Sequence, residues 1–169
     1  MSFLELAKKR FSARSYNSKE IPQETLDIIL EAARVAPTAA NKQPVRLLVA
    51  KSDEARAKLA KAANIYNAPV AIIVCADTSL AWTRPFDGMQ TTDIDASILT
   101  DHLMLAATDQ GLGSVWICYF KPDVIRKEFD LPENLIPINI LAIGYTDEKP
   151  DTTRHDTKRI PKEELVKYL

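Results

Sequence analysis

Apolar and polar residues follow one another along the chain in patterns that predict both helices and strands. Residues 22–36 place apolar side chains at helical spacing, and the pattern ends before Pro37, which predicts an amphipathic helix. Residues 70–76 are an unbroken apolar run, which is typical of a strand buried on both faces. Residues 92–110 carry apolar side chains around most of a helical circumference, so we expect a central, nearly surrounded helix.

Shorter patterns complete a single domain in which helices and strands are mixed. Ser2 and Glu5 have the spacing of a capping box, which predicts a helix over residues 3–10. The other predicted elements are helices at residues 53–63, 122–128 and 158–166, and strands at residues 45–50, 113–119 and 138–144. A chain of 169 residues, 46% of them hydrophobic, can bury a core without disulfides or metals.

The charge balance and the cysteines narrow the function classes. A net charge of −1 argues against nucleic acid or an anionic membrane as the main partner. No apolar run is long enough to span a bilayer and the first residues carry no secretory signal, so we expect a cytoplasmic protein. Cys75 and Cys118 lie in apolar runs, and both are expected to be small buried thiols in a reducing compartment.

Several common catalytic motifs are absent from the sequence. Its four glycines form neither a phosphate-binding P-loop nor a dinucleotide fingerprint. Two histidines and no Cys-x-x-Cys pair give poor support for a metal site, and neither histidine suits a hydrolytic triad. If the protein is an enzyme, a bound organic cofactor is therefore expected to carry the chemistry.

Two stretches offer candidate cofactor contacts. Arg10 and Arg14 are four residues apart, so on a helical turn they would point the same way beside Ser12 and clasp a phosphate. A solvated basic face is the alternative. Residues 36–44 lie between a predicted helix and a predicted strand, and their polar side chains could match the donors and acceptors along a flavin edge. A plain polar connection is the alternative there.

Residues 10–16, 36–44, 111–117 and 158–161 together resemble the FMN-dependent nitroreductase family. The resemblance runs in order over nearly the whole chain. It implies an α+β three-layer sandwich, with a central mixed, mainly antiparallel sheet, helices on both faces and an intertwined homodimer. It also implies one FMN-binding domain over residues 1–169, in which residues 147–169 embrace the partner subunit.

The resemblance implies roles for individual residues. The implied cofactor-binding residues are Arg10, Phe11, Ser12, Arg14, Pro37, Thr38, Ala39, Asn41, Gln43, Trp116, Ile117, Cys118 and Arg159. Within this set, the N-terminal residues and Arg159 would hold the phosphate and ribityl end. Residues 37–41 would approach the flavin of the other subunit, and the backbone of residues 116–119 would follow the ring edge.

The implied activity is transfer of hydride or electrons from NAD(P)H through FMN to a small acceptor such as a nitroaromatic or a quinone. Both substrates would use one face in turn, which is a ping-pong scheme without an obligatory side-chain acid or base. Within the family, flavin fragmentation and reductive dehalogenation remain open. A flavin carrier or sensor, or a structural domain without FMN, are the alternatives outside this class.

The acceptor site is where the sequence departs from the family pattern. Residues 77–91 form only a short loop where longer relatives carry a helical excursion, and Val45 stands where an aromatic residue is common. Trp82 and Phe86 on this loop, with Tyr119 after the third predicted strand, are expected to bind the acceptor. The alternative is that both loop aromatics plug the edge of the sheet.

Overall fold

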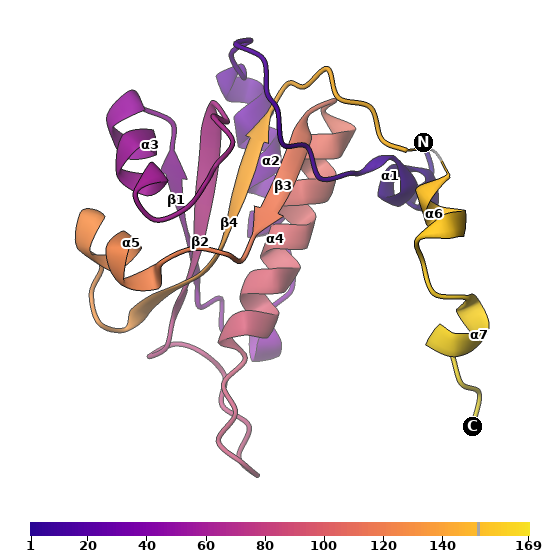
Figure 1. The fold of residues 1–169 in the computed structure, drawn as a ribbon. Coiled ribbons are helices and arrows are strands. Elements are labelled where there is room, and N and C mark those ends of the chain that lie inside the picture. Colours follow the sequence, from indigo (N-terminus) through magenta and orange to yellow (C-terminus); the bar gives the residue numbers. More distant parts are fainter. Residues whose placement is uncertain (152) are drawn as a thin grey trace.

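A computed structural model describes residues 1–151 and 153–169. At its centre lies a four-stranded antiparallel sheet with the strand order β1-β2-β4-β3 (Figure 1). The strands are β1 Val45–Ala50, β2 Val70–Asp77, β3 Gly113–Ile117 and β4 Leu135–Gly144. The helices are α1 Phe3–Lys9, α2 Gln23–Arg34, η1 Ala39–Asn41, α3 Asp53–Ala60, α4 Thr92–Asp109, α5 Pro122–Glu128, α6 Arg154–Thr157 and α7 Lys162–Leu165.

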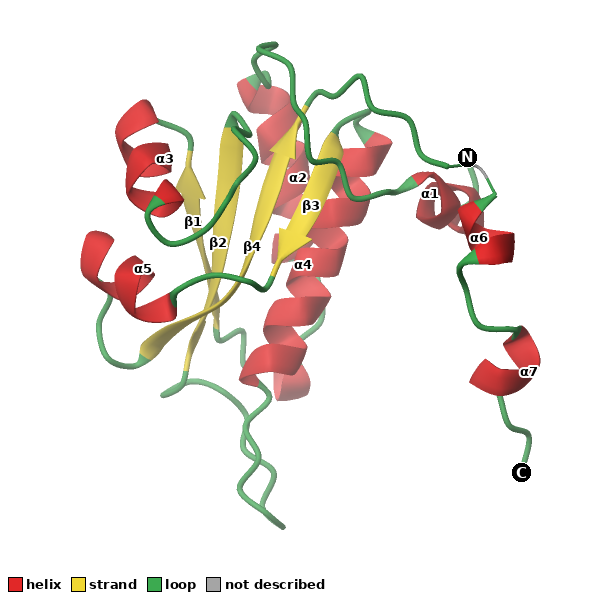
Figure 2. Cartoon of the chain, in the orientation of Figure 1, coloured by secondary structure: helices red, strands yellow, loops and turns green. Residues whose placement is uncertain are grey.

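Helices cover both faces of the sheet, as Figure 2 shows. Successive residues of β2 point to opposite faces, so Ile72 packs with Leu103 of α4 while Ile73 packs in the second core cluster. Leu59 of α3 and Ile125 of α5 belong to that second cluster. Two cores are therefore separated by a sheet buried on both sides, which confirms the α+β class.

Several local predictions are confirmed. Ser2 Oγ accepts from the Glu5 backbone while the Glu5 side chain accepts from the Ser2 backbone, which is the predicted capping box. The bounds of β1 and α5 match the predicted segments. Gly111 follows α4 with φ of +78°, a conformation that suits glycine after a helix.

Other predictions about element ends are wrong. The third strand stops at Ile117, and Cys118 is exposed where a buried thiol was predicted. The last ladder pair joins Ile117 to Ile140, and the chain then turns toward α5, so the next residues have no strand partner. The predicted final helix over residues 158–166 is limited to α7, and α6 was not predicted.

Helix α4 is central, but it is not surrounded within one chain. It packs against α1, α2 and all four strands. On its outer side, however, Ile94 is 49% exposed. No helix in the described part of the chain is long and apolar enough to cross a membrane.

The C-terminal residues lie apart from the sheet. After β4 the chain runs past α1, and α7 extends away from the body (Figure 1). The side chains of Ile160, Leu165 and Tyr168 are exposed. One copy of the chain therefore leaves these apolar side chains of an otherwise charged tail without a packing surface.

Candidate functional site

The segment that follows α1 runs as extended chain beside β3. Ser12 forms an isolated parallel bridge with Ser114, and the Ala13 amide donates to the Ser114 carbonyl at 2.9 Å. The helical turn predicted for Arg10 and Arg14 is therefore wrong. Because alternate residues of an extended chain point to the same side, both arginines and Ser12 still share one side.

Tyr16 fixes this segment against the sheet. Its hydroxyl donates to the Ala13 carbonyl at 2.9 Å and also lies 3.2 Å from the Ala142 carbonyl of β4. Burial raises the pKa of Tyr16, so the hydroxyl stays protonated and remains a donor. A Cβ on Gly113 would lie 2.8 Å from the Ala13 Cβ, which explains the glycine at this close approach.

Positive charge gathers where α1, the extended segment and the tail meet. Burial lowers the pKa of Arg10, and the nearby charges of Arg159 and Arg154 lower it further, while Asp101 opposes the shift. Arg154 donates to the Arg10 carbonyl at 2.9 Å and also to the Lys8 carbonyl. This places part of the C-terminal segment directly on the end of α1.

The basic groups lack acidic partners and border two cavities. In residues 1–151 and 153–169, no carboxylate lies within 4.0 Å of the charged nitrogens of Arg10, Arg14, Arg154 or Arg159. Arg14 and Arg154 line a cavity of about 400 Å³, and Arg10 lines one of about 240 Å³. The two cavities share three lining residues, Phe11, Glu148 and Pro150. The arrangement can bind an anion.

Two members of this basic region were not found from the sequence. Arg154 is 144 residues from Arg10, and no local pattern announces their contact. Glu148 accepts a hydrogen bond from the Arg14 amide at 2.7 Å, so it orients the backbone of the segment rather than neutralising a guanidinium. The only sequence signal for Arg154 and Glu148 is the high content of charged residues in the tail.

A third cavity, of about 390 Å³, opens where β3 ends. Ile117 and Tyr119 line it together with Phe120 and with Asn64 and Tyr66 of the linker between α3 and β2. Trp116 lies on the opposite face, against the core beneath α4. Of the residues predicted near the ring, this cavity therefore includes Ile117 and Tyr119, and Cys118 stands exposed between them.

The loop over residues 37–43 stands at the other end of α4. The Ala39 amide donates to Asp95 in the first turn of that helix, whereas the Arg10 cavity includes Thr108 near the last turn. Thirteen residues of helix separate these two points by about 20 Å. Within one chain, none of the predicted loop contacts lines either cavity beside the arginines; these contacts are Pro37, Thr38, Ala39, Asn41 and Gln43.

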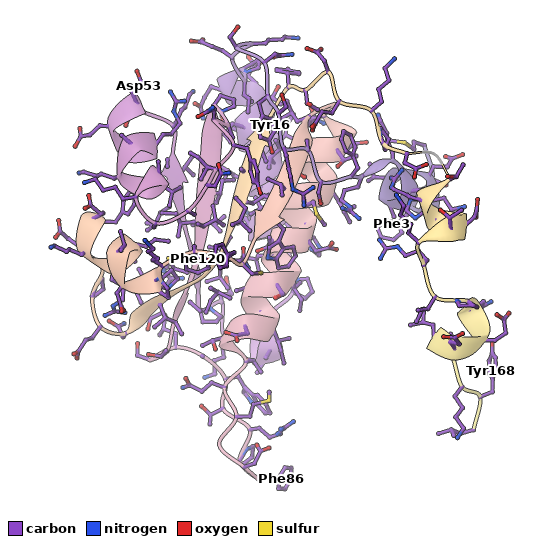
Figure 3. All side chains as sticks on the ribbon, in the orientation of Figure 1. Phe3, Tyr16, Asp53, Phe86, Phe120 and Tyr168 are labelled. Carbon is purple, nitrogen blue, oxygen red and sulfur yellow. The ribbon has the colours of Figure 1, made fainter. Side chains whose placement is uncertain are left out.

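Residues 77–91 form a hairpin-like excursion that projects from the body. Thr83 pairs with Gln90, and Arg84 pairs with Asp87 to close the tip. Phe86 is 93% exposed at that tip, far from Phe120 in Figure 3. It does not plug the sheet edge. Trp82 is half-buried at the base, and neither aromatic lines the cavity beside Ile117.

Comparison with known proteins gives consistent matches over this whole architecture. The family model described as "Nitroreductase family" matches residues 7–65 and 61–145. A solved structure of a nitroreductase family protein from Clostridium difficile 630 is 56% identical, with a TM-score of 0.97 over 99% of this chain and 98% of that chain. An FMN-dependent nitroreductase from Clostridium difficile R20291 is 28% identical, with a TM-score of 0.74 over 95% of this chain and 99% of that chain.

A curated protein from Methanothermobacter thermautotrophicus, provisionally named NADH dehydrogenase/NAD(P)H nitroreductase, is 36% identical over 160 residues. The match covers 90% of this chain and 81% of that relative. The family model covers most of the chain and the relatives match it nearly end to end, so the resemblance suggested by four short stretches is confirmed. The chain belongs to the nitroreductase family.

Proposed function

We propose that the protein binds FMN and uses it to pass electrons from NAD(P)H to a small planar acceptor, such as a nitroaromatic compound or a quinone. One relative is named an FMN-dependent nitroreductase, and the name of another gives NAD(P)H as donor. Bound FMN would supply the hydride transfer, so the side chains need only bind, orient and exclude water.

The basic region supports binding of the FMN phosphate, and it is the observation that carries the proposal. Arg154 donates to the Arg10 carbonyl at 2.9 Å, and burial, together with the charges of Arg159 and Arg154, lowers the Arg10 pKa. A phosphate dianion would relieve this repulsion and would accept bidentate hydrogen bonds from guanidinium groups. Ser12 and Arg14, on the same extended segment, would bind the phosphate and the ribityl chain.

The cavity at the end of β3 suits the flavin ring. It combines apolar walls from Ile117 and Phe120 with the amide of Asn64, which can donate and accept. The backbone of residues 116–119 would follow the ring edge. Phe11 would pack near the ribityl chain, because it lines both cavities of the basic region.

We further propose that the site is completed by a second copy of the chain. No residue of the 37–43 loop lines either cavity beside the arginines, so a partner would supply its contacts to the same flavin. A two-fold symmetric dimer would build this arrangement twice. Residues 147–169 would then embrace the partner, which would cover the exposed α7.

The acceptor would stack above the ring between Tyr119 and the hairpin of the partner. Tyr119 is 95% exposed beside the flavin cavity. Phe86 stands at a tip that reaches no cavity beside its own Ile117, so a partner's site is the better location for it. Trp82 supports the base of the same hairpin.

Titration of the apo-protein with FMN tests the cofactor assignment. Arg14→Ala removes an exposed guanidinium without an acidic partner, so folding should be little affected. A hydrogen bond to a charged group is worth about 1.5–3 kcal/mol, so the FMN Kd should rise about 10- to 150-fold. Lys127→Ala, an equal charge change on α5, should leave the Kd unchanged. Wild-type protein that binds no FMN contradicts the proposal.

Turnover separates an enzyme from a flavin carrier or sensor. NADH or NADPH oxidation by the FMN-loaded protein should accelerate when a nitroaromatic or a quinone is added. Initial rates at several fixed acceptor concentrations should give parallel double-reciprocal lines, as expected when both substrates use one face in turn. A loaded protein that oxidises neither nucleotide would instead be a carrier or sensor.

A further inference from the structure

Asp95 is a fully buried carboxylate that contacts two loops. It lies in the first turn of α4 and is 0% exposed, and no other charged side chain among the described residues is buried. Its Oδ1 accepts a hydrogen bond from the Ala39 amide at 2.9 Å, and its Oδ2 accepts one from the Thr91 hydroxyl at 2.9 Å. A buried charge is costly unless it is bonded in this way.

The loop that Asp95 contacts has an unfavourable backbone. Ala40, Asn41 and Gln43 have φ values of +48°, +52° and +50°, in the left-handed region that non-glycine residues seldom adopt. Inside the loop, the Gln43 amide donates to Thr38 Oγ1 at 3.0 Å and the Gln43 side chain donates to the Asn41 carbonyl at 3.2 Å. Such a conformation persists when its surroundings fix it, and the bond to Asp95 joins it to the helical core.

The second contact joins Asp95 to the base of the hairpin. The Thr91 amide donates to the Trp82 carbonyl at 3.0 Å, while the Thr91 hydroxyl donates to Asp95. One carboxylate therefore connects the base of the hairpin with the loop over residues 37–43. Both of these segments were placed at a partner's flavin in the proposed function.

We propose that Asp95 is a positioning residue that holds the 37–43 loop in the conformation in which Asn41 meets the flavin of the partner. The expected effect on FMN binding rests on the proposed function. The hydrogen bond by which Asp95 fixes the loop is present in the chain without cofactor. Asp95 does not touch the flavin. Its effect on FMN binding passes through the loop. Removing Asp95 and removing Asn41 should therefore lower the same part of the FMN binding free energy.

A simpler role for Asp95 is a negative charge near the positive end of the α4 dipole. Asp93 is the matched control, because it stands in the same first turn and is exposed. If the dipole alone mattered, Asp93→Ala and Asp95→Ala would have similar effects. Loss of the loop contact is specific to the Asp95 variant.

Hydrogen exchange of the apo-protein tests the hold on the loop. In Asp95→Ala, the Ala39 amide should exchange about 10- to 150-fold faster, as expected for losing a hydrogen bond to a charged group. Asp93→Ala should exchange as wild type does. Asp95→Asn keeps an acceptor oxygen and should lie between the two, and it serves if Asp95→Ala does not fold. Unchanged protection of Ala39 in both Asp95 variants overturns the inference.

A double-mutant cycle tests the link to the flavin. Asp95→Ala and Asn41→Ala are each expected to raise the FMN Kd, but together they should raise it less than the product of their separate effects. If the double variant instead raises the FMN Kd by the full product of the two separate effects, Asp95 and Asn41 act independently. Asp95 would then have only a structural role, seen as a lower melting temperature. If wild-type protein binds no FMN, the proposed function fails, whereas the exchange result still decides the hold on the loop.

Discussion

At the scale of single residues, burial divides the two cysteines into an inert thiol and a reactive one. Burial raises the pKa of Cys75 to about 12, so at pH 8 only about one molecule in 10⁴ carries the nucleophilic thiolate. Cys118 is exposed after β3. In the FMN-free protein, we expect one thiol per chain to react rapidly with an aromatic disulfide reagent, and the second only after unfolding.

The pH dependence of this reaction follows from the upward shift of the Cys75 pKa. Raising the pH toward 9 should not make Cys75 reactive, since its folded pKa lies far above that range. Cys118→Ser should abolish the fast phase, whereas Cys75→Ser should leave it intact. Two fast thiols in the wild type would contradict the burial of Cys75.

Arg154 connects the tail with the end of α1, and its loss should affect both. Its guanidinium donates to the carbonyls of Lys8, Arg10 and Asp151, a planar arrangement that lysine cannot reproduce. We expect Arg154→Lys to weaken FMN binding about tenfold and to make the tail more sensitive to limited proteolysis, as expected for losing about 1.4 kcal/mol. Lys162→Ala, at an exposed position in the same tail, is the control. If the Arg154→Lys variant keeps a protease-resistant tail and the wild-type affinity for FMN, Arg154 does not belong to the FMN site.

At the scale of elements, long sequence patterns predict where a helix or strand lies, but they do not predict where it ends. The periods of β2 and α4 repeat over many residues, so both were located to within one residue. Cys118 and Tyr119 look like strand residues, but β4 offers them no partner beyond Ile117. Spacing alone predicts a helical turn at Arg10, because it cannot distinguish such a turn from an extended chain held by β3.

The hairpin over residues 77–91 is expected to act on the acceptor rather than on folding. Phe86→Ala should leave the melting temperature nearly unchanged, because the ring is 93% exposed. Loss of one stacking contact worth about 0.5–1.5 kcal/mol should lower kcat/KM for a planar acceptor roughly 2- to 13-fold. Stopped-flow kinetics can separate flavin reduction from reoxidation.

The control for this prediction is Leu80→Ala, which truncates another exposed apolar residue of the same excursion away from its tip. Its kinetics should match the wild type. Trp82→Ala, at the half-buried base, should lower the melting temperature as well. If the Phe86 variant reoxidises at the wild-type rate with every planar acceptor, the hairpin does not reach the site.

At the scale of the whole molecule, the candidate site could be predicted only through motifs. Arg10 and Arg154 meet through tertiary structure, which no spacing in the sequence encodes. The loop at Asn41 lines neither cavity beside the arginines, so a single chain does not explain why their motifs occur together. A partner subunit would explain that combination.

The last prediction is that dimerisation and FMN binding are lost together when the tail cannot pack. Ordering a residue costs about 1–2 kcal/mol. Leu165 at the end of α7 is 71% exposed and Tyr168 beyond it is 87% exposed, so this segment has no core of its own in one chain. We therefore expect wild-type protein to sediment as a dimer. The double variant Leu165→Asp/Tyr168→Asp should sediment as a monomer. Its FMN binding should be weakened, because Arg159 and the partner's 37–43 loop would no longer contact the cofactor. Lys167→Asp changes the net charge equally in the same tail and should remain a dimer. A wild-type monomer that retains FMN, or a double variant that stays dimeric, would show that the tail does not hold the subunits together.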